Sequence, residues 1–207
     1  MAGVKQRGKF ITLEGVDGAG KSTPVSWIAG QLRAAGHEVA VTREPGGTPF
    51  AEKLRALVLA EPMGPLGETL LMFAARADHV DRVILPALER GAWVVCDRFT
   101  DATLAYQGGG KGVSRDLILR LAQFVHPGIT PDRTLVFDCS YAVSRSRLSA
   151  SGRALDRFEA EERAFFERVR LAYRDLANAE PGRVRIIDGS KTPEEVKVNV
   201  KNNISSI

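Results

Sequence analysis

Residues 15–22 match the pattern G-x-x-x-x-G-K-[ST] at every fixed position. Glycines in such a loop let successive backbone N–H groups turn toward phosphate oxygens, and the helix N-terminus that follows adds partial positive charge. Lys21 would then reach the β- and γ-phosphates of a nucleoside triphosphate, while the Ser22 hydroxyl could bind Mg²⁺. The apolar run 9–14 precedes the motif and a helical pattern follows it, which is the context the motif requires. We therefore expect a nucleoside triphosphate site formed by Gly15, Val16, Asp17, Gly18, Ala19, Gly20, Lys21, Ser22 and Thr23.

A second candidate for phosphate chemistry is Asp97, which ends the apolar run 93–97 and is followed at once by Arg98. Ligands of a parallel sheet bind outside the carboxyl ends of its strands. A lone acid at the end of a strand is most often a cap, but after a phosphate loop it favours a metal ligand. We expect Ser22 and Asp97 to hold Mg²⁺ together. Asp138 ends another strand without such company and is interpreted as structural.

The segment 144–157 carries Arg145, Arg147, Arg153 and Arg157 among serine, glycine and alanine. Small residues around arginines are typical of a lid that closes over phosphates and brings in positive charge. The simpler alternative is a solvated basic loop.

Alternating strands and helices are predicted from the hydrophobic pattern along the whole chain. Continuous apolar runs separated by helices indicate a parallel sheet covered on both faces. The expected strands are 9–14, 38–42, 93–97, 134–138 and 183–188, and the expected helices are 22–35, 49–59, 68–90, 114–124, 142–148, about 158–176 and one that begins after Thr192. The glycine-rich stretch 107–112 is expected to separate two of these units. We predict one α/β domain over residues 1–207, of the phosphate-loop NTPase type with five parallel strands.

The composition is that of an ordinary globular protein, with 44% hydrophobic and 26% charged residues and a net charge of +4. No apolar run approaches the ~20 residues of a membrane span, and the first residues lack a signal-like stretch. The absence of Lys/Arg blocks and zinc spacings argues against nucleic acid and leaves a small anionic substrate. Cys96 and Cys139 are expected to be buried, reduced thiols, so we expect a cytoplasmic protein without membrane partners. His37, His79 and His126 have no metal-site spacing and are interpreted as surface or helix residues.

Several enzyme classes share the phosphate loop. A GTPase would need an N-K-x-D sequence after a strand, which this chain does not contain, and a translocating ATPase would be larger. Small size, an internal arginine lid and the Asp97-Arg98 pair favour a nucleotide kinase. A regulatory module that binds nucleotide without turnover is the alternative outside the enzymes.

Five segments carry a resemblance to a known family: FITLEGVDGAGKST, TREPGGTP, FAAR, CDRFTDATLAYQGGG and LDRFE, in this order over residues 9–160. Together they resemble the bacterial thymidylate kinases. The resemblance implies transfer of a phosphoryl group from ATP to dTMP, giving ADP and dTDP in dTTP biosynthesis, with Mg²⁺ and as a homodimer. Another nucleoside or deoxynucleoside monophosphate kinase stays open as an alternative.

The same resemblance implies roles for individual residues. Asp17 would accept from the 3′-hydroxyl of dTMP, and Arg55 and Arg98 would hold its phosphate. Phe73 and Arg76 would stack on thymine and read its O4 edge. The remaining implied dTMP contacts are Pro45, which would line the base pocket, Thr103 and Gln107, which would contact the base, and Tyr106, which would crowd the sugar 2′ position.

Two positions depart from the pattern of many relatives. The stacking phenylalanine often lies four residues before the arginine, where this chain has Met72, so Phe73 would have to take its place. Some relatives carry a basic residue in the phosphate loop where this chain has Gly18. We therefore expect the catalytic cations to be Lys21, Arg98 and a lid arginine, Arg153, with Arg147 and Arg157 as further lid residues.

Overall fold

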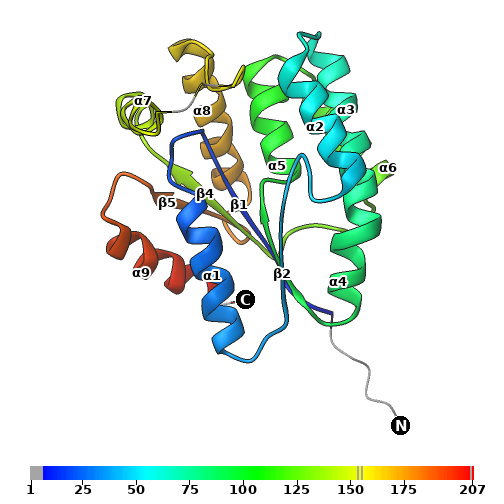
Figure 1. The fold of residues 1–207 in the computed structure, drawn as a ribbon, viewed down its shortest axis with the longest axis vertical. Helices are drawn as coiled ribbons and strands as arrows, with labels where there is room; N and C mark the ends of the chain where they lie inside the picture. Colours follow the sequence, from blue (N-terminus) through cyan, green and yellow to red (C-terminus); the bar gives the residue numbers. More distant parts are fainter. Residues whose placement is uncertain (1–6, 153, 155, 206) are drawn as a thin grey trace.

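Five parallel strands form the centre of the molecule, in a computed structural model that describes residues 7–152, 154, 156–205 and 207 (Figure 1). The strands are β1 (Phe10–Gly15), β2 (Val39–Arg43), β3 (Trp93–Asp97), β4 (Arg133–Asp138) and β5 (Val184–Asp188). They are hydrogen-bonded in the order β2-β3-β1-β4-β5, and every neighbouring pair is parallel. β1 is the central strand, so the phosphate loop that follows it lies in the middle of the carboxyl edge. The predicted parallel sheet is confirmed.

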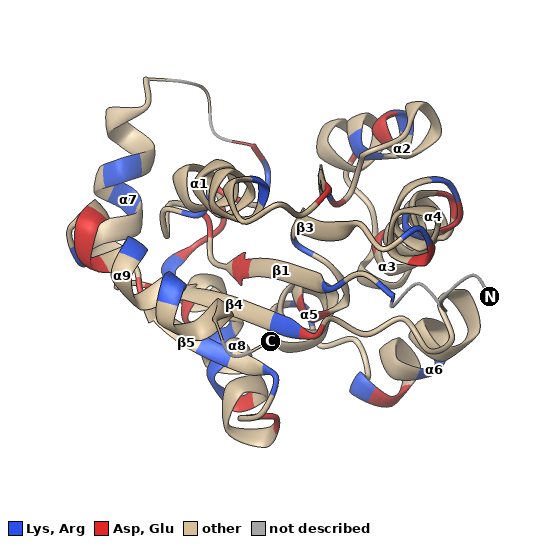
Figure 2. Ribbon diagram, turned by 90° about the horizontal axis from the view of Figure 1, so that it is seen from below, with Lys and Arg blue, Asp and Glu red and all other residues tan. Residues whose placement is uncertain are grey.

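Helices cover both faces of this sheet (Figure 2). They are α1 (Ser22–Ala34), α2 (Pro49–Ala60), α3 (Pro65–His79), α4 (Leu85–Glu89), α5 (Thr100–Thr103), α6 (Arg115–Val125), α7 (Tyr141–Ala150), α8 (Arg163–Ala179) and α9 (Pro193–Ile204), with two π-helical segments, η1 (Val80–Ile84) and η2 (Leu104–Gly110). On one face α1 packs on β2 and β3 and contacts α9, which packs on β4 and β5. α5 and α8 cover the opposite face, and η2 packs against both of them.

The interior strands are buried along almost their whole length, as expected for a parallel sheet with two covered faces. Ile11, Leu13 and Leu135 are fully buried in the core. Cys96 and Cys139 are buried and unpaired, as predicted. No helix in the described part of the chain is long and apolar enough to cross a membrane.

The predicted helix 68–90 is helical throughout but not regular. Between α3 and α4 the backbone forms the π-helical turn η1. There the Leu85 N–H donates to the Val80 carbonyl, which is five residues back instead of the four of an α-helix. Pro86 follows directly and cannot donate to a carbonyl of the preceding turn, which accounts for the wide turn at this place. Among the apolar residues of this segment, Phe73, Val80 and Ile84 are buried, whereas Leu70 is exposed.

The glycine-rich stretch 107–112, expected to separate two units, instead lies mostly inside η2. Its glycines serve close packing against α8. A Cβ atom on Gly109 would lie 2.5 Å from the Cβ of Ala172, and one on Gly110 would collide with the Phe165 ring. The predicted break is confined to residues 111–114, which separate η2 from α6, while Gly109 and Gly110 allow two helical segments to approach.

The segment predicted as a lid is partly helical. α7 includes Arg145 and Arg147 and ends at Ala150, and α8 begins only at Arg163. Arg153 lies outside the described residues. The turns at 157–160, before α8, include Arg157 and Phe158, and Arg157 contacts α2 and α3.

Candidate functional site

Two cavities lie on either side of the phosphate loop at the carboxyl edge of the sheet. The first cavity is lined by Asp17, Glu44, Pro45, Arg55, Leu59, Met72, Arg76, Arg98, Phe99, Ala102, Thr103, Tyr106, Gln107, Asp156 and Phe158. The second cavity is lined by Ala19, Gly20, Thr23, Pro24, Trp27, Phe137, Arg147, Gly189, Lys191, Pro193, Val196 and Lys197. The loop thus contributes Asp17 to one cavity and Ala19 and Gly20 to the other.

The phosphate loop has the backbone that its sequence predicts. Gly15, Gly18 and Gly20 have φ angles of 126°, 75° and 95°, a region that side chains other than glycine rarely adopt. The Lys21 ammonium donates to the carbonyls of Gly15 and Val16 at 3.1 and 3.2 Å. Lys21 is buried, and its ammonium lies against the backbone of the loop, where it can contact phosphates bound by that loop.

Both acidic and basic side chains surround Lys21. Burial and the neighbouring Arg98 lower the pKa of Lys21, while Asp17, Asp97 and Glu14 oppose that shift. Three acids from β1, the loop and β3 therefore lie close to this one cation. Anionic phosphates would add to their effect and favour the charged ammonium.

Asp17, Arg98 and Tyr106 form a triangle between the phosphate loop and the first cavity. The Arg98 guanidinium forms an ion pair with Asp17 and donates to the Tyr106 hydroxyl at 3.0 Å. That hydroxyl donates to the second Asp17 oxygen at 2.8 Å. Burial opposes ionisation of Asp17, but Arg98 and Lys21 outweigh it and hold the pKa of Asp17 below its usual value. Asp17 is therefore an acceptor at neutral pH.

Arg98 has a φ of 70° and is the only non-glycine residue of the described chain with positive φ. The next residue fixes this turn, because the Phe99 N–H donates to the Glu14 carboxyl at 2.7 Å. Tyr173 donates to the other Glu14 oxygen, also at 2.7 Å. Burial, with Asp101 adding to it, raises the pKa of Glu14 to about 8. A strained backbone held by a buried acid is typical of a functional site.

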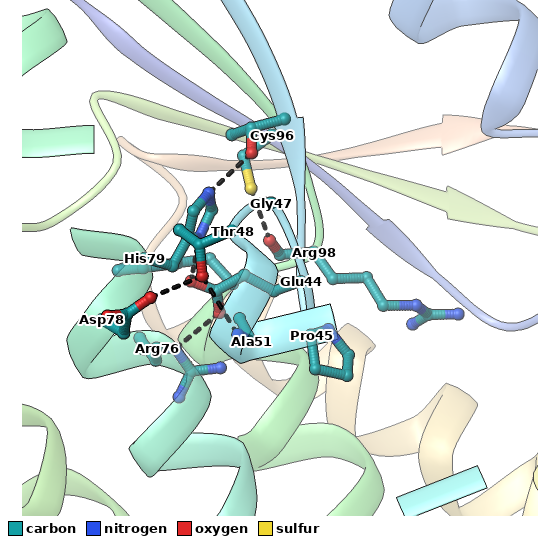
Figure 3. Close-up of polar contacts among 12 residues, drawn as sticks. Glu44, Pro45, Gly47, Thr48, Ala51, Arg76, Asp78, His79, Cys96 and Arg98 are labelled. Atoms are coloured by element: carbon teal, nitrogen blue, oxygen red, sulfur yellow. Dashed lines mark hydrogen bonds and ion pairs between the residues drawn. The ribbon is translucent and has the colours of Figure 1, made fainter. Parts of the chain in front are cut away.

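Arg76 lines the first cavity and is held by Glu44 (Figure 3) and by Thr103. Its Nε donates to Glu44 at 2.7 Å and one terminal nitrogen donates to Thr103 at 3.1 Å. The other terminal nitrogen is buried and has no hydrogen-bond partner among the described residues. His79 contacts the second Glu44 oxygen at 2.9 Å and the Thr42 hydroxyl at 2.6 Å. One terminal NH₂ group of a rigid arginine is thus left for a ligand.

The expected dTMP contacts lie together in the first cavity, with one exception. Asp17, Pro45, Arg55, Arg76, Arg98, Thr103, Tyr106 and Gln107 all line it. Phe73 is 2% exposed and lies beneath Arg76, whose guanidinium carbon is 4.7 Å from the ring centroid. The cavity wall at this place is Met72. Met72 therefore faces the cavity at this place, whereas Phe73 supports the Arg76 guanidinium from below.

Three residues important to this geometry were not found from the sequence. Glu44 is part of the REPGGT motif but received no role, and only its place before Pro45 could have drawn attention to it. Glu14 reads as the last residue of an apolar strand. His79 lies in a helix, as expected, at the end of α3, but it is fully buried. His126 is also buried, at 7% exposure; its Nδ1 donates to the Ile129 carbonyl and its Nε2 contacts the Thr100 hydroxyl. Polar partners in distant segments allow this burial, and spacing does not reveal them.

The residues expected to hold Mg²⁺ fit that ion. Asp97 ends β3, and its buried Oδ1 has no hydrogen-bond partner among the described residues. Ser22 is the exposed first residue of α1. Carboxylate and hydroxyl oxygens are suitable Mg²⁺ ligands. Asp138, by contrast, is bound by Arg170 and Arg174, which agrees with its structural interpretation.

Two of the lid arginines lie near the cavities. Arg147 on α7 lines the second cavity, and its guanidinium is 3.4 and 3.3 Å from the carbonyls of Gly18 and Ala19. Arg157 forms an ion pair with Glu68 of α3 and donates to the Val58 carbonyl. The expected catalytic arginine, Arg153, lies outside the described residues.

Comparison with known proteins agrees with this geometry. Residues 13–200 match the family model described as thymidylate kinase. The chain is 57% identical over 201 residues to a thymidylate kinase of Bordetella pertussis, covering 97% of this chain and 96% of that protein. It is 55% identical to one of Nitrosomonas europaea, covering 94% and 91%. The crystal structure of thymidylate kinase from Ehrlichia chaffeensis superposes with a TM-score of 0.79 at 32% identity, covering 96% of this chain and 99% of that one. The chain belongs to the thymidylate kinase family.

Proposed function

We propose that this protein transfers the γ-phosphoryl group of ATP to dTMP, giving ADP and dTDP for dTTP biosynthesis. The observation that carries the proposal is the first cavity, which is lined both by a buried arginine with one free terminal NH₂ group, Arg76, and by a second arginine beside the phosphate loop, Arg98. The free N–H of Arg76 suits the O4 atom of a pyrimidine. Arg98 and Arg55 suit the 5′-phosphate, which must lie near the loop to accept the phosphoryl group.

In this arrangement the sugar of dTMP lies between base and phosphate. Asp17 accepts from the 3′-hydroxyl, which its ionised state supports. Tyr106 lies against the 2′ position and favours deoxyribose. Thr103, Gln107, Pro45 and Met72 surround the base.

ATP binds with its triphosphate in the loop formed by residues 15–23. The second cavity continues from Gly20 past Trp27 and Arg147 and suits the adenosine. Ser22 and Asp97 hold Mg²⁺, which when bound neutralises charge on the β- and γ-phosphates.

No general base is required, because the attacking phosphate of dTMP is mostly dianionic at pH 7. The obstacle is repulsion between two anions, which fixed positive charges reduce. Lys21 is positioned for the β- and γ-phosphates, and Arg98 for the acceptor phosphate. We assign the charge that meets the transferring group to Arg153 of the lid.

The protein acts as a homodimer in the cytoplasm. Exposed apolar side chains on the adjacent helices α2 and α3 support the dimer, among them Phe50, Leu57, Leu66 and Leu70. The buried free thiols Cys96 and Cys139 are consistent with a reducing compartment.

An assay that couples ADP release to NADH oxidation tests the reaction with dTMP, dUMP, dGMP and AMP as acceptors. We expect turnover with dTMP far above that with either purine nucleotide. Equal rates with AMP or dGMP would favour another nucleoside monophosphate kinase. ATP binding without ADP release from any acceptor would favour a non-catalytic nucleotide-binding module.

A further inference from the structure

A fully buried carboxylate, Glu68 near the start of α3, lies behind the first cavity without lining it. It binds three side chains from two other parts of the chain. Gln107 donates its Nε2 to one Glu68 oxygen at 2.8 Å. Lys111 donates to the other oxygen at 2.8 Å, and Arg157 forms an ion pair with that same oxygen. Two cations on one carboxylate offset the cost of burying it.

The contact with Glu68 fixes which way the Gln107 amide faces. A carboxylate only accepts hydrogen bonds, so the NH₂ group of Gln107 must point to Glu68. The amide carbonyl of Gln107, on the cavity-lining side chain, is then left for a ligand. An acceptor suits N3 of thymine or uracil, which carries a hydrogen, and it repels N3 of cytosine, which is itself an acceptor.

The same carboxylate also holds the C-terminal end of the lid segment 144–157. Arg157 donates to the Val58 carbonyl of α2 as well as to Glu68. The next residue, Phe158, forms part of the cavity wall. Its ring centroid lies 4.6 Å from the Arg157 guanidinium and 4.7 Å from the Lys111 ammonium. We call Arg157 and Phe158 the lid foot.

We propose that Glu68 is a positioning residue that selects the base and links it to the lid. It turns the Gln107 carbonyl toward N3 of the pyrimidine, and it holds the lid foot so that Phe158 closes the same cavity. The inference rests on the proposed function, in which this cavity takes the base of dTMP. Base recognition is then complete only when Arg157 is bound to Glu68.

The test measures kcat/KM for dTMP, dUMP and dCMP on Glu68→Gln, Gln107→Leu and the parent protein. A ratio of kcat/KM between two acceptors does not depend on how much of the enzyme is folded. The side-chain NH₂ of a glutamine at position 68 could donate to the Gln107 carbonyl, so the Gln107 amide could flip and place its NH₂ group toward the cavity. We expect the dTMP/dCMP ratio to fall on the order of tenfold, the worth of one hydrogen bond. The dTMP/dUMP ratio should stay constant, because the two bases are identical at N3 and O4.

Glu38→Gln is the matched control, because it removes an exposed ion pair with Arg90 that lies outside the cavity lining. If Glu68→Gln kept the parental dTMP/dCMP ratio while Gln107→Leu lowered it, the role of Glu68 would be overturned and the proposed function would still stand. A parental ratio in Gln107→Leu would show that Gln107 does not read the base, and the proposed site would fail together with the inference.

The link to the lid is tested by a double-mutant cycle on the KM for dTMP. Arg157→Ala removes a partly exposed side chain, so it serves even where Glu68→Gln folds poorly. We expect it to raise the KM for dTMP several-fold and leave the KM for ATP unchanged. Glu68→Gln combined with Arg157→Ala should be no worse than the more severe single variant. If the factors by which the two single variants raise the KM for dTMP multiplied in the double variant, the lid foot and Glu68 would act independently.

Discussion

At the scale of single residues, the site consists of cations whose positions are fixed by acids that do not react. Glu44 holds Arg76, Asp17 holds Arg98, and Asp17 and Asp97 lie close to Lys21. Charges fixed before the substrate arrives need no reorganisation during the reaction, which is what phosphoryl transfer between two anions requires. The cost of burying these acids is met by the same cations.

Lys21 is the residue whose loss should be most severe. It is the only lysine or arginine that the phosphate-loop motif places at the β- and γ-phosphates. We expect Lys21→Ala to lower kcat by roughly 10²–10³, corresponding to about 3–4 kcal/mol for one fixed charge contact. Steady-state kinetics with dTMP measures this, and near-parental turnover would show that the interpretation of the loop is wrong.

Arg76 should make the enzyme distinguish pyrimidines at the 4-position. Thymine and uracil offer an oxygen to its free N–H, whereas cytosine presents an amino group that leaves the buried nitrogen unpaired. We expect dCMP to be a far poorer acceptor than dTMP or dUMP. Comparable kcat/KM values for dCMP and dTMP would contradict the role of Arg76.

At the scale of elements, the end of β1 carries both the phosphate loop and the acid that holds the neighbouring turn. Glu14 binds the N–H that follows Arg98, and it lies close to Lys21. The strained turn after β3 therefore depends on a side chain of the adjacent strand. Because Glu14 lies in β1 and its pKa is raised on folding, this contact should make the free energy of unfolding depend on pH.

Glu14 keeps its proton in the folded protein up to about pH 8, since its pKa is raised from 4.5 to about 8. The unfolded chain releases that proton above about pH 4.5. The folded state therefore binds more protons between these values, so the contribution of Glu14 to stability is full below pH 4.5 and is lost as pH rises through 8. The slope is at most about 1.4 kcal/mol per pH unit.

The variant Glu14→Gln keeps an acceptor for the Phe99 N–H but cannot ionise. Relative to the parent, its free energy of unfolding should increase steadily from pH 5 to pH 8. Urea unfolding at several pH values measures the difference. A difference that does not change with pH would contradict the raised pKa of Glu14.

Elements with local signals could be predicted from the sequence, and elements fixed by distant contacts could not. The buried strands and the helix that begins after Thr192 agree with their patterns. The helical course of η2 could not be predicted, because Gly109 and Gly110 read as a break until α8 packs against them. In the site, motif residues such as Lys21 and Arg98 were found, while Glu14 and Glu68 act through partners far away in the chain.

The lid should show two arginines with different kinetic effects. Gly18 leaves the phosphate loop without a basic residue next to Asp17, so we expect Arg153→Ala to lose on the order of 10²-fold or more in kcat with little change in the KM for dTMP. Arg147 contacts loop carbonyls and lines the second cavity, so Arg147→Ala should be milder and should act mainly on the KM for ATP.

Steady-state kinetics on both lid variants, with each substrate varied in turn, decides between the assignments. A nearly silent Arg153→Ala with a severe Arg147→Ala would keep the lid but transfer the catalytic role to Arg147. Two silent variants would show that residues 144–157 are only a solvated loop.

At the scale of the whole molecule, the parallel sheet brings both substrate cavities to one edge. β1 is central, so the loop that follows it separates the first cavity from the second. The acceptor and the donor can therefore approach the loop from opposite sides, in the in-line arrangement that phosphoryl transfer requires. The exposed apolar side chains of α2 and α3 lie outside this region and are free for a partner.

The homodimer is the last prediction, and the exposed surface of α2 and α3 gives it a specific test. Leu66 and Leu70 lie one turn apart on α3 and are 52% and 47% exposed. Neighbouring exposed apolar side chains are typical of a surface that binds a partner. A glutamate there would place an unpaired charge in the interface and cost on the order of 3 kcal/mol or more, weakening the dimer at least ~10²-fold. We expect the parent and Val198→Glu, a control on α9, to sediment as dimers, and Leu70→Glu as a monomer. A monomeric parent would contradict the homodimer, and a dimeric Leu70→Glu would move the interface away from α2 and α3.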